Sequence, residues 1–432
     1  MIKYHKDVML SVPRCLCLGF FLAGSVALMG QVTVVPQGGE FSILGAVKGD
    51  QVLPSLSLAP SAGILVWQDN VVDKHGAGVG GALLNTSFGA SPIFCVNKTK
   101  TGDQIKPKVQ LLANGRIISV WESSAAGTPD IYARLARNSK DTNDYGSNFY
   151  TIDLRLNSYI TEQQTDPEVA PLPDGSAVVV WQSFGQDGSL WGIYARRVLA
   201  TGKMPEKEFL VNQYTSYNQR APAVATLANG NYVIVWISEQ ERYANSSDVY
   251  ARIFSPAGVP QTDEIPINAR ANYPNQCDSP AVAPLNDGGF TVVWSQKDTL
   301  APTNSWDVWG RAFSPSGSGL SPYEFRINTY LYGDQYHPQI AAGPAGSLVV
   351  WTSLGQDGSR EGVFGRFLAG GTQVSGTNDF QVNTTWRNRQ MHPAVAWNGV
   401  DRFLVVWTSF QVAGAGYDLY GQAYVLSSSP SP

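Results

Sequence analysis

The amino-acid sequence predicts an all-β fold and, within that class, a seven-bladed β-propeller of four-stranded blades. Three observations predict it. Seven tryptophans recur at an almost constant spacing, short apolar runs flank Asn-Gly and Asp-Gly turns, and the two ends of the chain supply complementary parts of one blade. Glycine and proline are abundant, at 43 and 26 residues, and no long helical pattern interrupts the predicted strands.

The first thirty residues precede the repeat and predict a secretory signal peptide. Lys3, Lys6 and Arg14 come before the apolar run CLCLGFFLAGSVALMG, which ends near small residues suited to cleavage after Ala27 or Gly30. The run is short for a membrane span of about 20 residues, and a short N-terminal anchor is the alternative interpretation. We therefore expect a secreted, periplasmic or cell-surface protein with no transmembrane segment once the signal is removed.

Charge and cysteine content narrow the expected partners. The formal net charge is −4, it becomes −6 without the first thirty residues, and no basic stripe is present. We therefore expect no nucleic acid or anionic membrane as a partner. Beyond the signal only Cys95 and Cys277 remain. Because they fall in non-adjacent repeats, we expect two separate buried thiols rather than a disulfide.

The repeat is defined by tryptophans that end runs such as VVVW. Consecutive members are 54 to 60 residues apart, a period that suits a four-stranded propeller blade. The tryptophans are Trp67, Trp121, Trp181, Trp236, Trp294, Trp351 and Trp407.

Each repeat contains four predicted strands in the same order. Strand one, such as residues 222–227 (PAVATL), leads through a tight turn into strand two, which is apolar on both faces, as expected between neighbouring sheets. Strand three reads IYARL or VFGRF after a loop of variable length. Strand four reads EFLVN or DFQVN, with the alternation of an outer strand. The turns include Asn114-Gly115, Asp174-Gly175, Asn229-Gly230 and Asp287-Gly288.

The two ends of the chain predict how the ring closes. The last repeat stops after strand three, at YDLYGQAYVL, whereas residues 39–44 (GEFSIL) form a strand four that belongs to no repeat. Pairing the N-terminal strand with the last blade completes the ring and removes exposed sheet edges. We therefore expect a signal peptide over residues 1–30, a single propeller domain over 31–426 and a flexible tail over 427–432.

The repeat also resembles a known style. A GQDG turn, GVFGRF, DFQVN and then Q-x-x-P-A-V-A resemble the roughly 55-residue, Trp-containing repeats of bacterial secreted and surface β-propeller proteins. The resemblance covers nearly all of the chain after the signal. It implies the propeller fold and brings no catalytic residues with it.

Three recurring residue types are interpreted as parts of the scaffold. The tryptophans are expected to fill space between blades, and the strand-three arginines to clamp blades through aromatic and carbonyl or acidic partners. A glutamine before each strand one is expected to tie down loop backbone. The arginines are Arg134, Arg196, Arg252, Arg311 and Arg366, with Gln422 and Gly81 in the remaining repeats. The glutamines are Gln51, Gln104, Gln164, Gln219, Gln276, Gln335 and Gln390.

Function is expected on the face formed by the four-to-one and two-to-three loops, around the mouth of the central channel. These loops vary most, and their aromatic side chains suit stacking on sugars or docking a protein partner. Packing of the loops against one another is the alternative interpretation. The candidate ligand-binding residues are Tyr159, Tyr214, Tyr273, Tyr330, Tyr336 and Trp386, with Tyr217, Tyr332, Trp191 and Trp306 nearby.

Three histidines map to one sector of the same face. His75 lies in the two-to-three loop of the first blade, and His337 and His392 precede the strand-one prolines of the sixth and seventh. Imidazoles gathered there could bind a divalent metal or serve as acid and base. Chance placement is the alternative, because no spaced metal motif is present. The expected cofactor is therefore none, with a divalent metal on these histidines as the alternative.

Together the observations favour a secreted, non-catalytic binding propeller that recognises a glycan or a protein partner on its loop-rich face. One alternative is a polysaccharide-active enzyme, a hydrolase or lyase, with its active site at the channel mouth. Another is a purely structural surface or assembly module. The sequence contains no nucleophile elbow, phosphate loop, HExxH or dinucleotide motif, and it names no catalytic residue.

Overall fold

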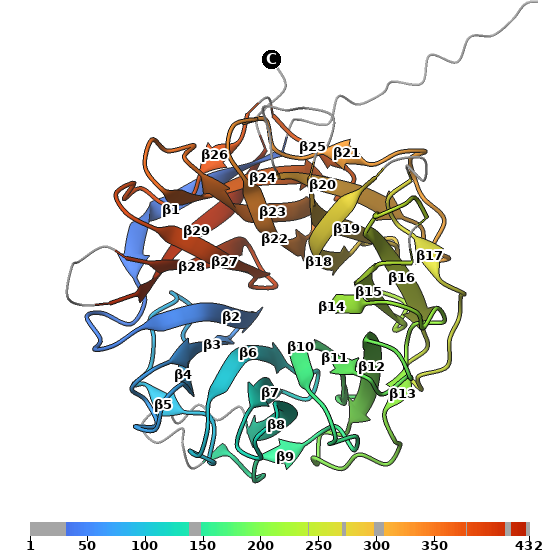
Figure 1. The fold of residues 1–432 in the computed structure, drawn as a ribbon. Helices are drawn as coiled ribbons and strands as arrows, with labels where there is room; N and C mark the ends of the chain where they lie inside the picture. Colours follow the sequence, from blue (N-terminus) through green and yellow to red (C-terminus); the bar gives the residue numbers. More distant parts are fainter. Residues whose placement is uncertain are drawn as a thin grey trace, which may run out of the picture.

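The computed structural model is a ring of seven antiparallel sheets, which confirms the predicted all-β, seven-bladed propeller (Figure 1). It describes residues 32–137, 148–240, 242–269, 274–297, 306–376, 378–410 and 416–428. The predicted signal peptide lies outside these ranges. Each sheet is one blade, and the blades are numbered I to VII from the one that begins with β2. Within the described ranges no helix is long and apolar enough to cross a membrane.

The blades share one strand order, and their first strands lie nearest the axis of the ring (Figure 1). These innermost strands are β2 (Gln51–Ala59), β6 (Gln104–Leu111), β10 (Gln164–Pro171), β14 (Gln219–Thr226), β18 (Gln276–Pro284), β22 (Gln335–Gly343) and β27 (Gln390–Trp397). The second strands are β3 (Ala62–Asp69), β7 (Arg116–Ser123), β11 (Ala177–Phe184), β15 (Tyr232–Ser238), β19 (Phe290–Lys297), β23 (Gly346–Leu354) and β28 (Arg402–Ser409). The third strands are β4 (Gly78–Leu84), β8 (Asp130–Arg137), β12 (Trp191–Val198), β16 (Asp248–Phe254), β20 (Trp306–Phe313), β24 (Glu361–Ala369) and β29 (Asp418–Ser428).

The outermost strands of blades I to VI are shorter than the five-residue runs expected from the sequence. Each pairs with strand three over two residues. Beyond this pairing, an asparagine side chain accepts a main-chain N–H of strand three, as where Asn97 Oδ1 accepts the N–H of Val79. The outermost strands are β5 (Phe94–Cys95), β9 (Leu154–Arg155), β13 (Phe209–Leu210), β17 (Ile265–Pro266), β21 (Phe325–Arg326), β26 (Phe380–Gln381) and β1 (Val32–Ser42). Blade VI has a further short strand, β25 (Gln373–Val374), on β24.

Ring closure follows the prediction. Strand β1 pairs antiparallel with β29, from Val32 opposite Ser428 to Ser42 opposite Tyr420, and completes blade VII. The pairing begins earlier than the expected residues 39–44, and β29 extends to Ser428, two residues into the predicted tail. In this way the N-terminal segment covers what would otherwise be the exposed edge of the last blade.

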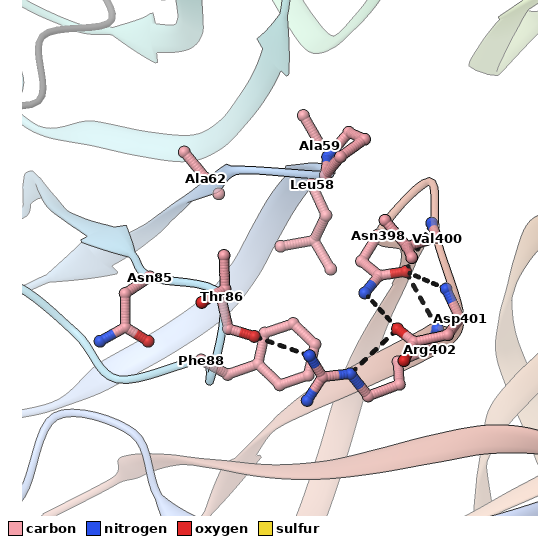
Figure 2. A pocket seen from close by; sticks show the side chains of 12 residues that line it. Leu58, Ala59, Ala62, Asn85, Thr86, Phe88, Asn398, Val400, Asp401 and Arg402 are labelled. Carbon is pink, nitrogen blue, oxygen red and sulfur yellow. Dashed lines mark hydrogen bonds and ion pairs between the residues drawn. The ribbon is translucent and has the colours of Figure 1, made fainter.

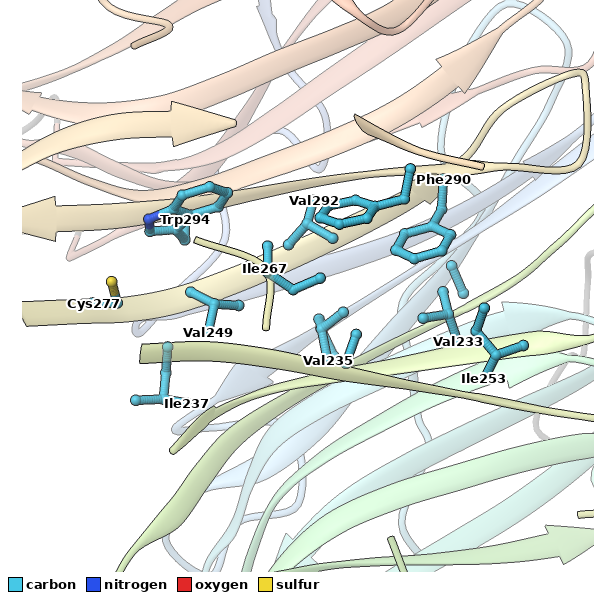
Figure 3. Packing of buried hydrophobic residues seen from close by; sticks show 14 of the residues in the cluster. Val233, Val235, Ile237, Val249, Ile253, Ile267, Cys277, Phe290, Val292 and Trp294 are labelled. Carbon is cyan, nitrogen blue, oxygen red and sulfur yellow. The ribbon is translucent and has the colours of Figure 1, made fainter. Parts of the chain in front are cut away.

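The core lies in the seams between blades, because strand two is apolar on both faces. In blade V, Val292 and Trp294 pack against blade IV, whereas Val293 packs against blade VI. Figure 3 shows the first of these clusters, where β15 and β19 meet. Each repeat tryptophan is at most 1% exposed, which confirms its expected role as a filler.

The strand-three arginines confirm the expected clamp. Each guanidinium donates from Nη1 to a main-chain carbonyl of the preceding blade, next to its outermost strand. The pairs are Arg134 with Val96, Arg196 with Leu156, Arg252 with Val211, Arg311 with Ile267, and Arg366 with Ile327, at 2.6 to 2.9 Å. In blade VII the buried Gln422 instead donates to the carbonyls of Gln37 and Gly38.

Six of the seven glutamines tie down loop backbone as expected, for example Gln219, which donates to the carbonyl of Ser216 at 3.0 Å. The seventh assignment, Gln276, is wrong by one residue. Gln276 is exposed, and Cys277 occupies the buried position that the glutamines hold elsewhere. Both cysteines are free, as expected, but only Cys277 is fully buried. Cys95 lies on the outermost strand of its blade and is half-buried.

The face opposite the expected functional face carries a clasp between the first and last blades. The guanidinium of Arg402 lies 4.9 Å from the ring centre of Phe88 and donates to the carbonyl of Thr86 and to Asp401 (Figure 2). These residues line a cavity of about 130 Å³. Because its charged groups are paired with one another, we assign this cavity to ring closure.

Candidate functional site

Seven residues of the innermost strands share an unusual backbone conformation. Each precedes a proline and has a φ between 49° and 54°, in the left-handed region that non-glycine residues rarely adopt. Each coincides with a bulge at the start of the strand, as between Tyr336 and Gln339 in blade VI. These residues, called the inner ring, are Leu53, Lys106, Asp166, Ala221, Ser279, His337 and His392. Strain of this kind persists where surrounding contacts enforce it.

The enforcing contacts come from the residue that follows each repeat tryptophan. Its side chain accepts a hydrogen bond from the main-chain N–H of the inner-ring residue in the next blade. Five seams are built in this way, by Thr408 with Leu53, Gln68 with Lys106, Glu122 with Asp166, Gln182 with Ala221, and Thr352 with His392, at 2.7 to 3.4 Å.

Two seams depart from this rule. Ile237 stands at the position in blade IV and cannot accept, and Ser279 donates to its own neighbour Asp278 instead. In blade V the residue is Ser295, whose short side chain is buried and whose Oγ has no hydrogen-bond partner among the described residues. Within the same ranges no side chain accepts from the N–H of His337. The seam between blades V and VI is therefore underfilled.

A cavity of about 290 Å³ occupies this seam on the face of the two-to-three and four-to-one loops. Blade V contributes groups from three strands and blade VI from the start of β22. The lining residues are Asp278, Ser279, Ser295, Trp306, Asp334, Tyr336 and His337. The Oδ1 atom of Asp334 is buried without a hydrogen-bond partner in the described chain. Partnerless polar atoms beside aromatic rings are the features of a small-molecule site.

The next seam brings a second histidine into contact with His337, which lines this cavity. The imidazoles of His337 and His392 lie 5.5 Å apart between ring centres, because they hold equivalent positions in adjacent blades. Burial, together with the neighbouring His337, lowers the pKa of His392 to about 4. Burial also lowers the pKa of His337 against the opposing effect of Asp278, and Lys108 acts in the same direction as burial. Both rings are therefore neutral at pH 7.

Tyr336 contacts His337 edge-to-face, with 5.1 Å between ring centres. Burial, followed by the carboxylates of Glu361 and Asp334, raises the pKa of Tyr336 to about 12. Its phenol is therefore a proton donor at neutral pH, next to an imidazole that can accept a proton. Opposed pKa shifts of neighbouring groups are characteristic of acid and base partners.

A cluster of paired charges lies where blades II and III meet. Lys106 pairs with Asp166 at 2.5 Å and with the buried Glu122 at 3.0 Å, and Lys108 pairs with Glu168 at 2.5 Å. Burial would lower the pKa of Lys106, but Asp166 and Glu122 raise it above its ordinary value. Burial raises the pKa of Glu122 against the opposing effect of Lys106. The charged groups of this cluster are paired with one another. The seam between blades V and VI differs, because it contains polar atoms without hydrogen-bond partners among the described residues.

The structure gathers only part of the predicted ligand-binding set. Tyr336 lines the cavity, as does the nearby Trp306. Tyr159, Tyr214 and Tyr330 recur at one repeat position, and their main-chain N–H groups are held by carboxylates of the next blade. The three tyrosines are half-buried and belong to three different blades, so they do not form one cluster.

Among the remaining predicted aromatics, Tyr217 is 51% exposed and Trp191 packs edge-to-face against Phe184. Trp386 is exposed, at 49%, and lies in the loop before β27. Tyr332 is 66% exposed and packs against Tyr330, in the loop that leads to Asp334. Tyr273 lies outside the described residues.

The predicted metal-binding histidines are divided. His337 and His392 are in contact, whereas His75 is exposed in the β3–β4 loop, where its N–H donates to Asp73. In the part of the chain that the structure describes, no group of three or more His, Cys, Asp or Glu side chains is arranged to hold a metal ion. The three histidines therefore do not form a metal-binding group in this structure.

Sequence reasoning missed Ser295, Ser279 and Asp278 as parts of the site. A signal was present in the residue after each repeat tryptophan, where Ser295 has the shortest side chain of the seven. A short residue at a position that bridges two blades leaves space between them.

No protein-family model matches the chain, and no curated protein matches it in sequence. Among solved structures it is similar to a protein of unknown function from Dyadobacter fermentans, with 12% identity and a TM-score of 0.54 over 92% of this chain and all of that one. It is similar to the polysaccharide lyase Uly1, with 10% identity and a TM-score of 0.58 over 88% and 90% of the two chains. It is also similar to an α-L-arabinanase of Penicillium chrysogenum complexed with arabinobiose, with 14% identity and a TM-score of 0.50 over 74% and 92%. Likeness at these identities shows the fold alone.

Proposed function

We propose that this chain is an exported, glycan-binding propeller whose binding site is the cavity between blades V and VI. The observation that carries the proposal is the underfilled seam. Ser295 Oγ and Asp334 Oδ1 lack hydrogen-bond partners in the described chain, and both residues line a cavity that also contains Trp306 and Tyr336. Such a cavity favours a ligand with several hydroxyl groups and a flat apolar face.

A sugar ring meets both requirements. Its hydroxyls donate to carboxylate oxygens and exchange hydrogen bonds with a serine hydroxyl, while its C–H face packs on an aromatic ring. The cavity volume, about 290 Å³, lies at the lower end of the range for small-molecule sites and suits a small ligand portion. The exposed Tyr332 and Trp386 belong to loops on the same face and could contact further sugar units of a chain.

Fold analogy supports the same ligand class. Two of the similar solved structures are described as a polysaccharide lyase and an arabinanase. Export is proposed from the basic residues and apolar run at the N-terminus of the sequence. Mass spectrometry of the mature N-terminus tests it, and an intact residue 1 on material recovered from outside the cytoplasm would contradict signal cleavage.

The binding proposal is tested with the purified full chain on a glycan array, followed by calorimetry with the strongest hit. Ser295→Thr, which fills the seam, and Tyr336→Ala, which removes a lining ring, are each expected to weaken binding at least tenfold. The matched control is Tyr323→Ala, which removes a 62% exposed tyrosine in the β20–β21 loop on the opposite face. A blank array, or binding that neither lining variant changes, would overturn the proposal.

A second candidate function is a polysaccharide-active enzyme that uses the same cavity. The observation that favours it is the contact between Tyr336 and His337, whose pKa values are displaced in opposite directions. A neutral imidazole can take a proton while a phenol gives one, as hydrolysis of a glycosidic bond requires. Release of reducing ends would identify turnover. Turnover by the parent that His337→Gln leaves unchanged would contradict this assignment.

A further inference from the structure

We infer that the sugar unit held in the cavity between blades V and VI carries no carboxylate or sulfate group. The inference rests on the proposed glycan-binding function and names the ligand class of that site. It follows from the charges that line the cavity, from the pairing of the cations near it, and from the environment of its histidines.

The lining itself is acidic. Of the seven described residues that line the cavity, Asp278 and Asp334 are carboxylates, and none is lysine or arginine. Asp334 Oδ1 has no hydrogen-bond partner in the described chain, so it is available to accept from a ligand hydroxyl. A ligand carboxylate at the position of this hydroxyl would be repelled by the carboxylate of Asp334 in a partly desolvated space.

The arginines next to the cavity are already engaged. Arg220 pairs with Asp278 at 3.1 Å and with Glu239 at 3.3 Å, so its charge is matched twice. Arg389 pairs with Glu361 at 3.4 Å and is not among the described lining residues. Recognition of a planar anion normally uses an arginine whose two N–H groups are free to bind it in parallel.

The lysines give the same result. Lys108, which acts on His337, is paired with Glu168 at 2.5 Å. Lys297 lies opposite Trp306 in the β19–β20 ladder and is not among the described lining residues. Asp278 is matched by Arg220 and Glu361 by Arg389, so Asp334 is the lining carboxylate that lacks an ion-pair partner among the described residues.

The histidines do not supply the missing charge at neutral pH. His337 and His392 are in contact, and protonation of one ring disfavours protonation of the other. His337 therefore contributes a neutral donor or acceptor for a hydroxyl group. A hydroxyl-rich, non-anionic sugar is the ligand that all of these groups accommodate.

The test compares sugar probes on the purified full chain by calorimetry at pH 7.5 and 50 mM salt. The non-anionic probes are arabinobiose, cellohexaose and a chitosan hexamer, and the anionic probes are a pentagalacturonate and a sulfated galactan oligomer. We expect binding of at least one non-anionic probe, lost in Ser295→Thr, and at least tenfold weaker binding of both anionic probes. Raising the salt to 500 mM should narrow this difference, because screening weakens the repulsion.

A charge variant tests directly whether the lining carboxylate disfavours anionic ligands. Asp334→Asn keeps the shape of the side chain and removes one lining carboxylate, so the ratio of anionic to non-anionic affinity should rise at least fivefold. Glu206→Gln removes one charge from an exposed residue of the β12–β13 loop on the opposite face and should leave the ratio unchanged.

The outcomes are distinguishable. Preferred binding of an anionic probe that Ser295→Thr abolishes would overturn the inference and leave the glycan-binding function intact. No Ser295-dependent binding of any probe would overturn the proposed function and the inference together. An unchanged ratio in Asp334→Asn would show that lining charge does not select the ligand.

Discussion

Thr352 Oγ1 accepts a hydrogen bond from the main-chain N–H of His392 across the seam between blades VI and VII, at 3.2 Å. The two residues lie 40 positions apart in the sequence and hold the same relation as Thr408 and Leu53 one seam further on. A hydroxyl at this position thus fixes an inner-ring residue in its left-handed conformation. The serine at the same position in blade V carries a hydroxyl of the same reach, but it lacks the methyl group of threonine and its Oγ has no hydrogen-bond partner among the described residues.

Ser295→Thr should add to the seam between blades V and VI the methyl group that Thr352 and Thr408 carry at neighbouring seams. The buried methyl group should raise the free energy of unfolding by about 1 kcal/mol. It also occupies part of the cavity and should weaken glycan binding at least tenfold. Urea unfolding of the free protein and calorimetric titration measure the two effects separately.

Thr352→Ser supplies the reciprocal control. It removes one methyl group at an intact seam and keeps a hydroxyl that can still accept from His392, so it should lower stability by about 1 kcal/mol through lost packing. If both variants changed stability in the same direction, the space-filling role assigned to this position would be wrong.

Arg252→Gln tests the clamp between blades III and IV. The guanidinium donates to the carbonyls of Val211 and Thr262, at 2.9 and 3.0 Å, and lies 5.5 Å from the ring centre of Phe254. A glutamine is too short to reach both carbonyls, and we expect a loss of about 2 kcal/mol in the free energy of unfolding. Arg360→Gln, at an exposed position, is the control and should change stability by less than about 0.5 kcal/mol.

The scaffold could be predicted from sequence because each of its parts repeats. The spacing of the tryptophans gives the length of a blade, and their number gives the number of blades. Residues such as Arg252 and Gln219 make equivalent contacts in other blades. Even the contact between His337 and His392 follows from their equivalent positions in adjacent repeats.

The cavity could not be predicted in this way because it results from departures from the repeat. It depends on the length of one side chain, Ser295, and on which residues of two different blades face the gap. The misassignment of Gln276 has a related cause. One extra residue precedes the bulge of blade V, so that Cys277 takes the buried position.

Stability should fall as the pH is lowered from about 6.5 to about 4, partly through His392. Its pKa in the folded protein is about 4, below the ordinary value of 6.5, because of burial and the adjacent His337. The unfolded chain therefore binds the proton first, and each step down in pH through this window favours unfolding. His392→Gln should remove on the order of 2 kcal/mol of this loss.

The measurement is urea unfolding of parent and variant at several pH values between 7.5 and 4. Carboxylates titrate in the lower part of this window in both proteins, so the difference between the two curves isolates the histidine. His75→Gln, at an exposed position, should reproduce the pH dependence of the parent. Parallel curves for His392→Gln and the parent would contradict the prediction.

Tyr336→Phe separates binding from catalysis at the cavity. The change removes the phenolic O–H and keeps the ring that lines the cavity. If the ring acts only in binding, affinity should fall by less than about tenfold, which is the contribution of one neutral hydrogen bond.

If the phenol also donates a proton during turnover, the rate should fall by at least about 100-fold while affinity changes little. The raised pKa of Tyr336, about 12, keeps this proton in place across the neutral range, so the effect should not depend on pH between 6 and 9. Tyr323→Phe, in the exposed β20–β21 loop on the opposite face, is the matched control and should change neither quantity. Unchanged turnover in Tyr336→Phe would remove this residue from the chemistry and leave its ring as part of the sugar-binding surface.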